Sequence, residues 1–459
     1  MRLSTRFLAL GLAMVFAASV AVAQMAPIQY WRPSDQTGLN IFETTKDSGA
    51  AFNGLGVRIG GGFTQGYQVL SHENYATDTD GNLKEGITSD ADKANKLYTI
   101  GAGFNNASAN LNIDAQLARG VRMNLVLYLS SRHHQETWVK GGFIQMDDLS
   151  FLGSSFLDDL MKYLTIRLGH MEINFGDSHF RRSDGGATIY NPFVENYIVD
   201  AFTTEIGGDI AFQSNGIIGV FGITNGEIKG NIVPLADSLG GATPAIYLKL
   251  GYDTKVDDDF RVRVTGSMYT QSQSPRNTLL WGDRTGSNYY MVMEKAMQNS
   301  TTASNATAQA WSGRLNPNFA NNITMFEFNA FLQLGGLEFF GTYNMGSGSS
   351  SPAQKASALG DRSMNQLAAD LLYRFGAARN IYVGARYNVA NIELGNLDTA
   401  GEYAMSSSDR IAIAAGWYIL DQMLLKGEYM MQNYNDFAAG DYRNEGKING
   451  FIIQAVVGF

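Results

Sequence analysis

The stretch from 176 to 202, GDSHFRRSDGGATIYNPFVENYIVDAF, concentrates charged side chains of both signs. Aromatic side chains such as Tyr190 and Phe193 are interleaved with them. Fixed charges beside aromatic walls can filter charged solutes in a narrow aqueous path. The charged and titratable candidates are Asp177, His179, Arg181, Arg182, Asp184 and Glu195.

Signatures of catalysis and metal binding are weaker. The 5 histidines show no spacing such as H-E-x-x-H, and Ser178 and His179 are neighbours that cannot by themselves form a nucleophile and base pair. Asp78, Asp80 and Asn82 in DTDGN carry oxygen ligands suited to calcium, but glycine follows Asp80 too early for an EF-hand loop. An Asp-Gly turn is the simpler interpretation. We therefore expect no enzyme activity, no metal and no cofactor.

Composition restricts the classes of protein that remain. The 459 residues include no cysteine, 51 glycines, 12% aromatic residues and 45% hydrophobic residues. Disulfide scaffolds, thiol enzymes and disordered chains are excluded by these values. The 34 basic residues are outnumbered by 43 acidic ones and form no strongly basic stretch, which argues against nucleic acid as a partner.

The first residues have the pattern of an export signal. Arg2 and Arg6 precede an apolar run over 7–20, and a small-residue A-V-A site ends at Ala23. A membrane anchor is the poorer alternative, because the run is short for a bilayer span. Cleavage after Ala23 would leave a mature chain that begins at Gln24 and carries a formal charge of −11 instead of −9. We expect a bacterial envelope protein.

Beyond the leader, the dominant pattern is period-two alternation. No later stretch reaches the roughly 18 to 20 apolar residues that a membrane helix needs. At the end of the chain, Phe451, Ile453, Ala455, Val457 and Phe459 lie on one face of an extended strand. An apolar strand that ends on an aromatic residue resembles the C-terminal signature of outer-membrane barrels, which the barrel-insertion machinery reads. An ordinary core strand is the alternative.

Alternating segments recur along the mature chain, and the connections between them are short and long in turn. The expected strands are 55–69, 97–117, 121–131, 137–146, 164–175, 203–213, 216–224, 245–253, 260–271, 323–334, 337–345, 365–375, 381–392, 409–418, 423–434 and 447–459. Such sorting is typical of bacterial barrels with short periplasmic turns and longer outer loops, and only 147–163 departs from it.

The predicted fold class is therefore all-β, a transmembrane antiparallel β-barrel of about 16 strands, with 14 to 18 possible. A periplasmic N-terminal segment over 24–54 precedes a barrel over 55–459. The stretch 272–322 is expected to be a long extracellular loop.

The strand faces predict a polar lumen. Phe260, Val262 and Val264 would face lipid, while Arg261 and Arg263 face inward, because an arginine at the midplane of a barrel costs roughly 2 to 4 kcal/mol. Such charges would line an aqueous channel, or alternatively form ion pairs that brace the wall. The lumen candidates are Arg58, Asp114, Arg122, Lys249, Arg261, Arg263, Glu327, Glu338, Asp370, Arg374, Arg386, Lys426 and Glu428.

The stretch 176–202 is the third long outer connection. In the general porin plan this loop folds into the barrel and narrows it, which would place its charges at the constriction. If it stays outside, Arg181 and Arg182 are surface charges that face lipopolysaccharide phosphates.

One region has the character of a motif. LTIRLGHMEINFGDSHFRRSDGG, a strand that runs into a Phe-Gly-Asp turn, resembles the corresponding region of outer-membrane porins of the phosphate-selective porin O/P type. The chain has no ladder of lysines and a mature charge of −11, so phosphate specificity does not carry over. The Gly-Asp turn also resembles alginate-export channels. A homotrimer is what the resemblance to porins implies.

We expect an outer-membrane porin, a passive diffusion channel for small polar or charged solutes. The alternatives are a substrate-specific channel for anions or carbohydrates, and a structural or adhesive barrel plugged by 176–202. The expected partners are outer-membrane lipid, lipopolysaccharide, the insertion machinery and small polar solutes, but not nucleic acid.

Overall fold

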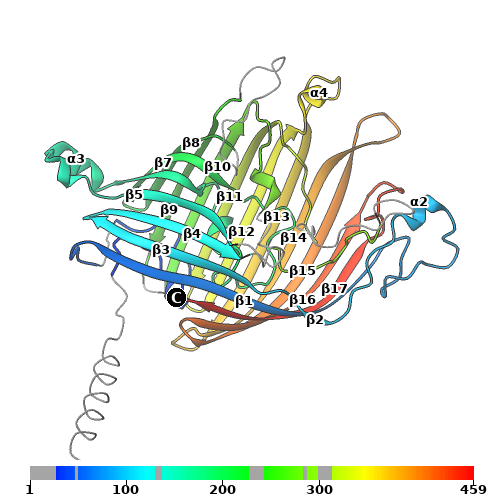
Figure 1. Ribbon diagram of the computed structural model, residues 1–459, viewed down its shortest axis with the longest axis horizontal. Coiled ribbons are helices and arrows are strands. Elements are labelled where there is room, and N and C mark those ends of the chain that lie inside the picture. Colours follow the sequence, from blue (N-terminus) through cyan, green and yellow to red (C-terminus); the bar gives the residue numbers. More distant parts are fainter. Residues whose placement is uncertain are drawn as a thin grey trace, which may run out of the picture.

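The computed structural model describes residues 27–46, 50–129, 137–226, 242–257, 259–282, 287–297 and 313–459. Their strands form one closed antiparallel barrel (Figure 1), which confirms the predicted fold class. The strands are β1 (Gly56–Glu73), β2 (Gly103–Phe104), β3 (Ser108–Ala118), β4 (Val121–Leu129), β5 (Trp138–Met146), β6 (Leu164–Glu172), β7 (Thr204–Ser214), β8 (Ile217–Thr224), β9 (Ala245–Lys255), β10 (Phe260–Gln271), β11 (Asn322–Leu334), β12 (Leu337–Ser349), β13 (Arg362–Phe375), β14 (Ile381–Leu397), β15 (Tyr403–Leu420), β16 (Met423–Asn435) and β17 (Lys447–Gly458).

Sixteen of these strands make the wall, and β2 is a two-residue addition beside β1. Each strand pairs with the next along the chain, and the ring closes where β1 pairs with β17 from Gly62 opposite Gly458 to Glu73 opposite Lys447. On its other side, β1 pairs with β3. Closure leaves no free sheet edge, as a barrel in lipid requires.

The expected strand 97–117 is interrupted in the structure. Leu97 bridges to Lys295, and Ala296 N–H donates to the Lys96 carbonyl at 2.8 Å. The chain before β2 therefore pairs with a loop instead of the barrel wall, and regular pairing with β1 resumes at Ser108. The prediction of one continuous strand here was wrong.

The connections are sorted by length between the two ends of the barrel. Tight turns join β3 to β4, β7 to β8, β11 to β12 and β15 to β16 at the end where β1 begins and β17 finishes, here called the turn end. Long connections lie at the opposite loop end (Figure 1). The short helices are η1 (Gln36–Gly38), α2 (Asp90–Lys93), η2 (Ser150–Leu152), α3 (Ser155–Met161), η3 (Ser178–Arg181), η5 (Leu279–Trp281) and α4 (Pro352–Lys355).

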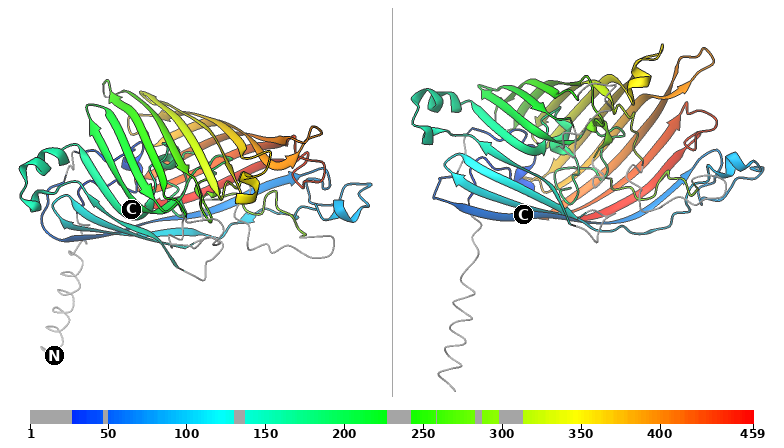
Figure 2. Two further views of the ribbon diagram at one scale, coloured as in Figure 1. Left: turned by 90° about the horizontal axis from the view of Figure 1, so that it is seen from above. Right: turned by 45° about the horizontal axis from the view of Figure 1, so that its top comes forward.

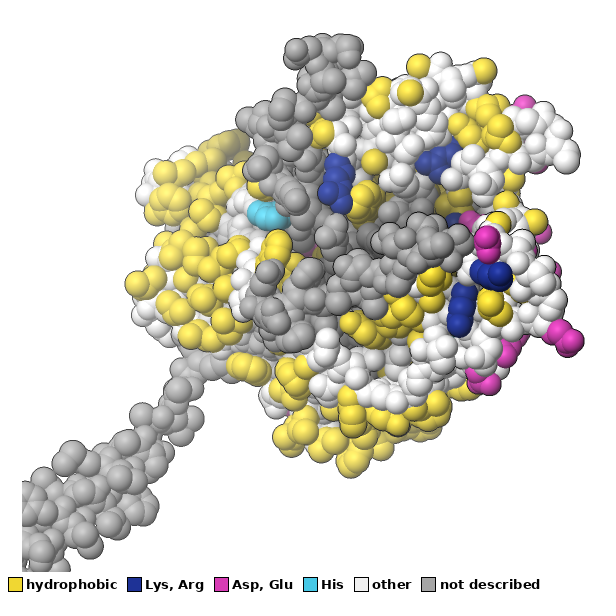
Figure 3. Space-filling view, turned by 45° about the vertical axis from the view of Figure 1, so that its right-hand side comes forward, with side chains coloured by type: hydrophobic (Ala, Val, Ile, Leu, Met, Phe, Trp, Pro, Cys, Tyr) yellow, Lys and Arg dark blue, Asp and Glu magenta, His cyan; other side chains and the backbone are white. Residues whose placement is uncertain are grey.

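The outer face of the wall is apolar and the inner face is polar. Val264, Leu371 and Ile413 are 53%, 52% and 57% exposed and point outward, whereas Asp370 and Arg410 are each 1% exposed and point inward. Apolar side chains cover much of the flank in Figure 3. Among the described residues, no helix has the length and apolar character needed to cross a membrane. The alternation of the strands thus creates a surface suited to lipid and an interior suited to charge.

Connecting segments run through the interior of the barrel (Figure 2). The main cluster of buried side chains joins residues of these segments, such as Phe193, to residues of the wall, such as Tyr382. Residues 27–46, here called the N-terminal strap, enter from the turn end. Residues 173–203, here called the constricting segment, cross the lumen, where Phe193, Ile198 and Val199 are almost fully buried. Described parts of 272–322, which the sequence suggested as an extracellular loop, also reach the interior, since Leu279, Tyr289 and others are buried there.

Candidate functional site

The constricting segment turns into the lumen directly after β6. Gly176 has a φ of +67°, and a Cβ at this position would lie 2.0 Å from the Glu327 carboxylate of β11. Only glycine fits this combination of left-handed backbone and close approach. Gly176 N–H donates to Ser267 Oγ of β10 at 3.0 Å, so the turn is fixed against the wall at β10.

Asp177, the next residue, is the centre of an ion-pair cluster. Its carboxylate accepts two hydrogen bonds from Arg263, both at 2.8 Å, and one from Thr265 at 2.8 Å, and it lies 3.0 Å from Lys249 Nζ. Burial alone would raise the pKa of Asp177, but the charges of Lys249 and Arg263 outweigh it and lower the pKa to about 2. Asp177 is therefore an anion at any physiological pH.

Acidic and amide side chains of the wall hold the segment by its backbone N–H groups. Glu327 accepts from Asp177 N–H at 3.2 Å and from Ser178 N–H at 3.3 Å. The remaining contacts of this kind are Val194 N–H to Glu428 at 2.9 Å, Ile198 N–H to Asn388 at 2.7 Å and Val199 N–H to Gln366 at 2.8 Å. Buried N–H groups need such partners, and the wall supplies them.

Cationic side chains of the wall hold the carbonyl groups of the same segment. Lys426 Nζ donates to the carbonyls of Thr188, Asn191 and Phe193 at 3.0, 2.9 and 2.7 Å. Arg386 donates to the Glu195 carbonyl at 2.8 Å, and Arg410 donates to the Asn196 carbonyl at 2.7 Å. The wall charges from β11 to β16 thus act as anchors of an internal segment.

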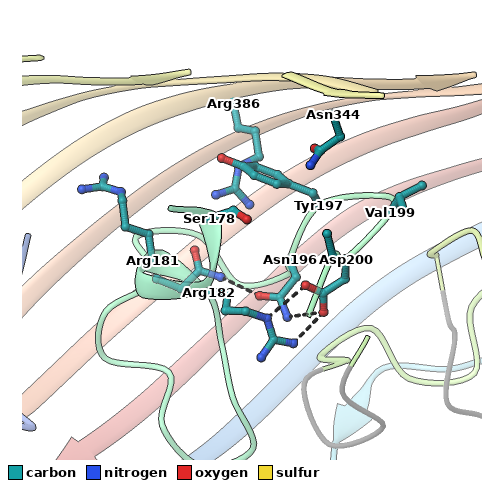
Figure 4. A pocket seen from close by; sticks show the side chains of 11 residues that line it. Ser178, Arg181, Arg182, Asn196, Tyr197, Val199, Asp200, Asn344 and Arg386 are labelled. Carbon is teal, nitrogen blue, oxygen red and sulfur yellow. Dashed lines mark hydrogen bonds and ion pairs between the residues drawn. The ribbon is translucent and has the colours of Figure 1, made fainter. Parts of the chain in front are cut away.

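Three guanidinium groups border a small cavity within the lumen (Figure 4). Arg181 and Arg182 come from the constricting segment and Arg386 from β14. The cavity measures about 10 Å³, roughly the room that one water molecule requires. Its other lining residues are Ser178, Asn191, Asn196, Tyr197, Val199, Asp200, Ala201 and Asn344.

Each arginine at the cavity is balanced by an acidic residue. Arg182 forms a two-pronged pair with Asp200 at 3.0 and 2.6 Å, drawn in Figure 4. Arg386 forms a similar pair with Asp370 at 2.7 and 2.8 Å. Arg181 lies 3.4 Å from Glu338. The three cations line the cavity, whereas two of these acids, Asp370 and Glu338, lie behind them in the wall.

The N-terminal strap reaches the same region from the turn end. Arg32 stacks on the Tyr190 ring at 3.7 Å and donates to the Phe180 carbonyl at 3.0 Å. Asn40 donates to Glu338 at 2.9 Å, and its side chain also bonds to Arg181. The strap therefore contacts the constricting segment as well as the wall.

Glu43 joins the strap to the Asp177 cluster. It lies 2.8 Å from Arg263 and 3.3 Å from Lys249. Burial alone would raise the pKa of Glu43, but Arg263 and Lys249 lower it well below its usual value. Beside the strap, a cavity of about 750 Å³ opens at the turn end, lined by residues that include Gln36, Lys255 and Arg379.

A third group of residues covers the site from the loop end. Glu195 accepts from Asn288 N–H at 2.7 Å and from Tyr289 N–H at 3.0 Å, and the Tyr289 hydroxyl bonds to Glu428. Leu315 N–H donates to the Ile198 carbonyl at 2.8 Å. The middle of the lumen is thus enclosed from both ends.

The charged side chains selected from the sequence all lie inside the barrel. His179 bonds to Glu172 and to Asn174, and burial lowers its pKa although the Glu172 charge opposes this. Asp184 pairs with Lys140 and lies 3.5 Å from Arg182. The predicted lumen residues that are at most 7% exposed are Asp114, Arg122, Lys249, Arg263, Glu327, Glu338, Asp370, Arg374, Arg386, Lys426 and Glu428.

Two further lumen candidates, Arg58 and Arg261, are less enclosed. Arg58 stacks on the Trp31 ring at 3.9 Å, and Arg261 pairs with Asp253 at 2.6 Å. Phe459, the predicted insertion signature, closes the seam by exchanging two backbone hydrogen bonds of 3.0 Å with Gly61. Within the described residues, no group of three or more His, Asp or Glu side chains is placed to hold a metal ion.

Several residues of the site were not predicted from the sequence. Arg410 lies on the inner face of β15 between outward-facing neighbours such as Ile411, so the alternation that identified Arg386 could have found it. Arg32, Asn40 and Glu43 of the strap carry no such signal, because the strap has no periodicity.

Comparisons with known proteins give a structural likeness only. No protein-family model and no curated protein matches the chain. Among solved structures, an anion-selective porin from Comamonas acidovorans matches with 10% identity and a TM-score of 0.49, covering 88% of this chain and 100% of that one. The outer membrane channel DcaP of Acinetobacter baumannii matches with 8% identity and a TM-score of 0.47, covering 89% and 99%. OmpT of Vibrio cholerae, an outer-membrane protein, matches with 9% identity and a TM-score of 0.46, covering 89% and 99%.

Proposed function

We propose that the protein is an outer-membrane channel through which small polar or charged solutes pass down their gradients. In this proposal the leader 1–23 is removed on export and the turn end faces the periplasm. The observation that carries it is the placement of Arg181, Arg182 and Arg386 around a cavity inside a barrel with an apolar outer face. Fixed charges at the narrowest part of an aqueous path select solutes by charge and size.

The arrangement of charges favours anions over cations at this point. The three guanidinium groups line the cavity directly, and among the described residues that line it Asp200 is the only acidic one. An anion that enters would find donors already oriented, since ion pairs with Asp200 and Asp370 hold Arg182 and Arg386 in place. The constriction would have to widen for anything larger than water, given the cavity of about 10 Å³.

A plugged barrel with a structural role is the second candidate. The observation in its favour is the density of contacts within the lumen, where Phe193, Val194 and Ile198 are 0% exposed. A barrel of this kind would carry no current unless its internal segments were shortened.

Single-channel recording in planar bilayers under a salt gradient separates the two candidates. For a channel we expect discrete current steps and a reversal potential that indicates anion preference. Arg182→Gln should move the reversal potential toward cations, whereas the matched control Arg119→Gln, at a turn where the side chain is 71% exposed, should leave it unchanged. Absence of current from the folded, heat-modifiable protein would favour the plugged barrel.

A further inference from the structure

The connection between β5 and β6 is unlike the tight turns at the turn end. It runs over 147–163 and contains η2 and α3, which project beyond the strands (Figure 1). The α3 helix begins at an N-cap, Ser154, whose side chain accepts from Leu157 N–H at 3.5 Å. A short turn would be enough to join β5 to β6, so the helices in this connection need a physical explanation.

This connection exposes large apolar side chains. Phe151, Leu152 and Phe156 are 62%, 57% and 71% exposed. Phe156 and Leu160 are four residues apart and share one face of α3, while Met161, 4% exposed, faces the protein. The helix therefore exposes an apolar face with Phe156 and Leu160 beside a polar side with Asp158 and Asp159, whereas a helix in water keeps its apolar face against the protein.

The exposed apolar surface continues onto the outer wall of the barrel. The Tyr163 ring packs against Phe212 of β7 with 6.1 Å between ring centroids, and Gln213 N–H donates to the Tyr163 carbonyl at 2.9 Å. Phe212 itself is 38% exposed on the outward face. The connection thus extends the surface of the barrel that faces lipid.

Exposed apolar side chains also lie close to the tight turns at other places around the barrel. Val256, directly after β9, is 61% exposed, and Leu420, at the end of β15, is 60% exposed. The apolar band therefore extends to the ends of the strands, at the level where the connection leaves β5 and returns to β6. Aromatic and apolar side chains at this level are typical of a membrane interface.

Charged side chains of the connection complete an amphipathic pattern. Lys162 pairs with Asp159 at 2.6 Å, and both side chains are largely exposed. Arg119, on the neighbouring turn, pairs with Asp148 at 3.0 Å and is 71% exposed. Polar groups of both signs beside an apolar face suit the zwitterionic head groups of phospholipids.

We propose that residues 149–163 lie in the interface of the phospholipid leaflet at the turn end, with Phe151, Phe156 and Leu160 inserted below the head groups. The occupant of this apolar face is lipid and not a second protein, because the face is continuous with the lipid-facing wall through Tyr163 and Phe212. The segment fixes the depth and tilt of the barrel on this side. The proposal does not depend on whether the lumen conducts.

The absence of cysteine from the chain makes a direct test possible. Phe156→Cys and, on the polar side of the same helix, Asp158→Cys would each carry a nitroxide label, and the mature protein would be reconstituted in phospholipid vesicles. Power saturation measures collision of each label with oxygen, which concentrates in lipid, and with a water-soluble nickel chelate. Leu371→Cys, at an outward position of β13, supplies the reference for a label in lipid.

We expect the oxygen-to-nickel accessibility ratio at position 156 to be several-fold higher than at 158 and close to that at 371. Leu160→Cys should repeat the result and replaces the first variant if that one fails the heat-modifiability check for folding. Equal ratios at 156 and 158 would place the helix in water and overturn the proposal. Protection of the label at 156 from both reagents would show a protein contact, such as a second copy, and would also overturn it.

Discussion

The constricting segment and the N-terminal strap both occupy the lumen, but the barrel holds them in different ways. The constricting segment is joined to the wall at both ends, through β6 and β7, and many of its backbone groups bond to side chains of the wall. The polypeptide chain leads from the strap into the wall through β1. The hydrogen bonds of the strap are made largely by side chains such as Arg32 and Glu43. The constricting segment is thus a built-in part of the barrel, whereas the strap can leave the lumen without disrupting a strand of the wall.

Removal of the strap tests this difference most directly and should have the largest effect. Deletion of 27–46 empties the region beside the cavity of about 750 Å³ and leaves the wall strands intact. We expect single-channel conductance to rise several-fold, because a wider path has a lower resistance. Heat-modifiable migration in gels checks that the shortened protein still folds, and an unchanged conductance would show that the strap lies outside the path of ions.

Asp177→Asn tests the constricting segment and should mainly lower stability. The substitution leaves Lys249 buried with Glu43 as its acidic partner, and Arg263 buried with Glu43 and Asp253. Loss of one partner of a buried ion pair costs about 3 to 5 kcal/mol, so the free energy of unfolding in urea should fall by about that amount. The matched control is Asp184→Asn on the same segment, where the carboxylate side chain is 24% exposed and a smaller loss is expected.

Acid titration supplies a second check on Asp177. The pKa of its carboxyl is lowered from 3.8 to about 2, so its contribution to stability is complete above pH 3.8 and is lost as the pH falls through 2. The difference in unfolding free energy between the wild type and Asp177→Asn should therefore shrink over this interval. A difference that stays constant down to pH 2 would contradict the assigned ion pairs.

Glu43→Gln should give the smallest effect of the series. It weakens the pairs of the strap with Arg263 and Lys249 but leaves the contacts of Arg32 and Asn40 in place. We expect more frequent brief openings in current recordings, with a change smaller than that of the deletion. Thr37→Ala, at an exposed position of the strap, is the control. An effect as large as the deletion would mean that Glu43 alone holds the strap.

The barrel could be predicted from the sequence because its signals are local. The alternation of Val262 and Val264 with Arg261 and Arg263 follows from the period of a strand and from the cost of a charge in lipid. The order of short and long connections then fixed which ends of the strands lie together. The segment that precedes the short strand β2 is the exception to this prediction. There Leu97 pairs with Lys295 instead of with the barrel wall.

The filled lumen could not be predicted in the same way. Asn40 and Glu338 are 298 residues apart, and the pair of Arg263 with Asp177 spans 86 residues. Contacts of this kind depend on which side chains the closed barrel brings together, and no periodic pattern encodes them. The inward orientation of Arg386 followed from strand geometry, but its bond to the Glu195 carbonyl did not.

The seam between β1 and β17 also bears on how the chain folds. β1 continues from the strap and pairs with the last strand, so the two backbone bonds between Gly61 and Phe459 form only after the whole wall exists. Before that moment Lys249, Arg263 and Glu338 lack the enclosed site in which Glu43 and Asn40 meet them. Strap docking therefore depends on barrel closure, although closure does not depend on the strap, and a partly assembled barrel would keep its interior charges hydrated until the final strand arrives.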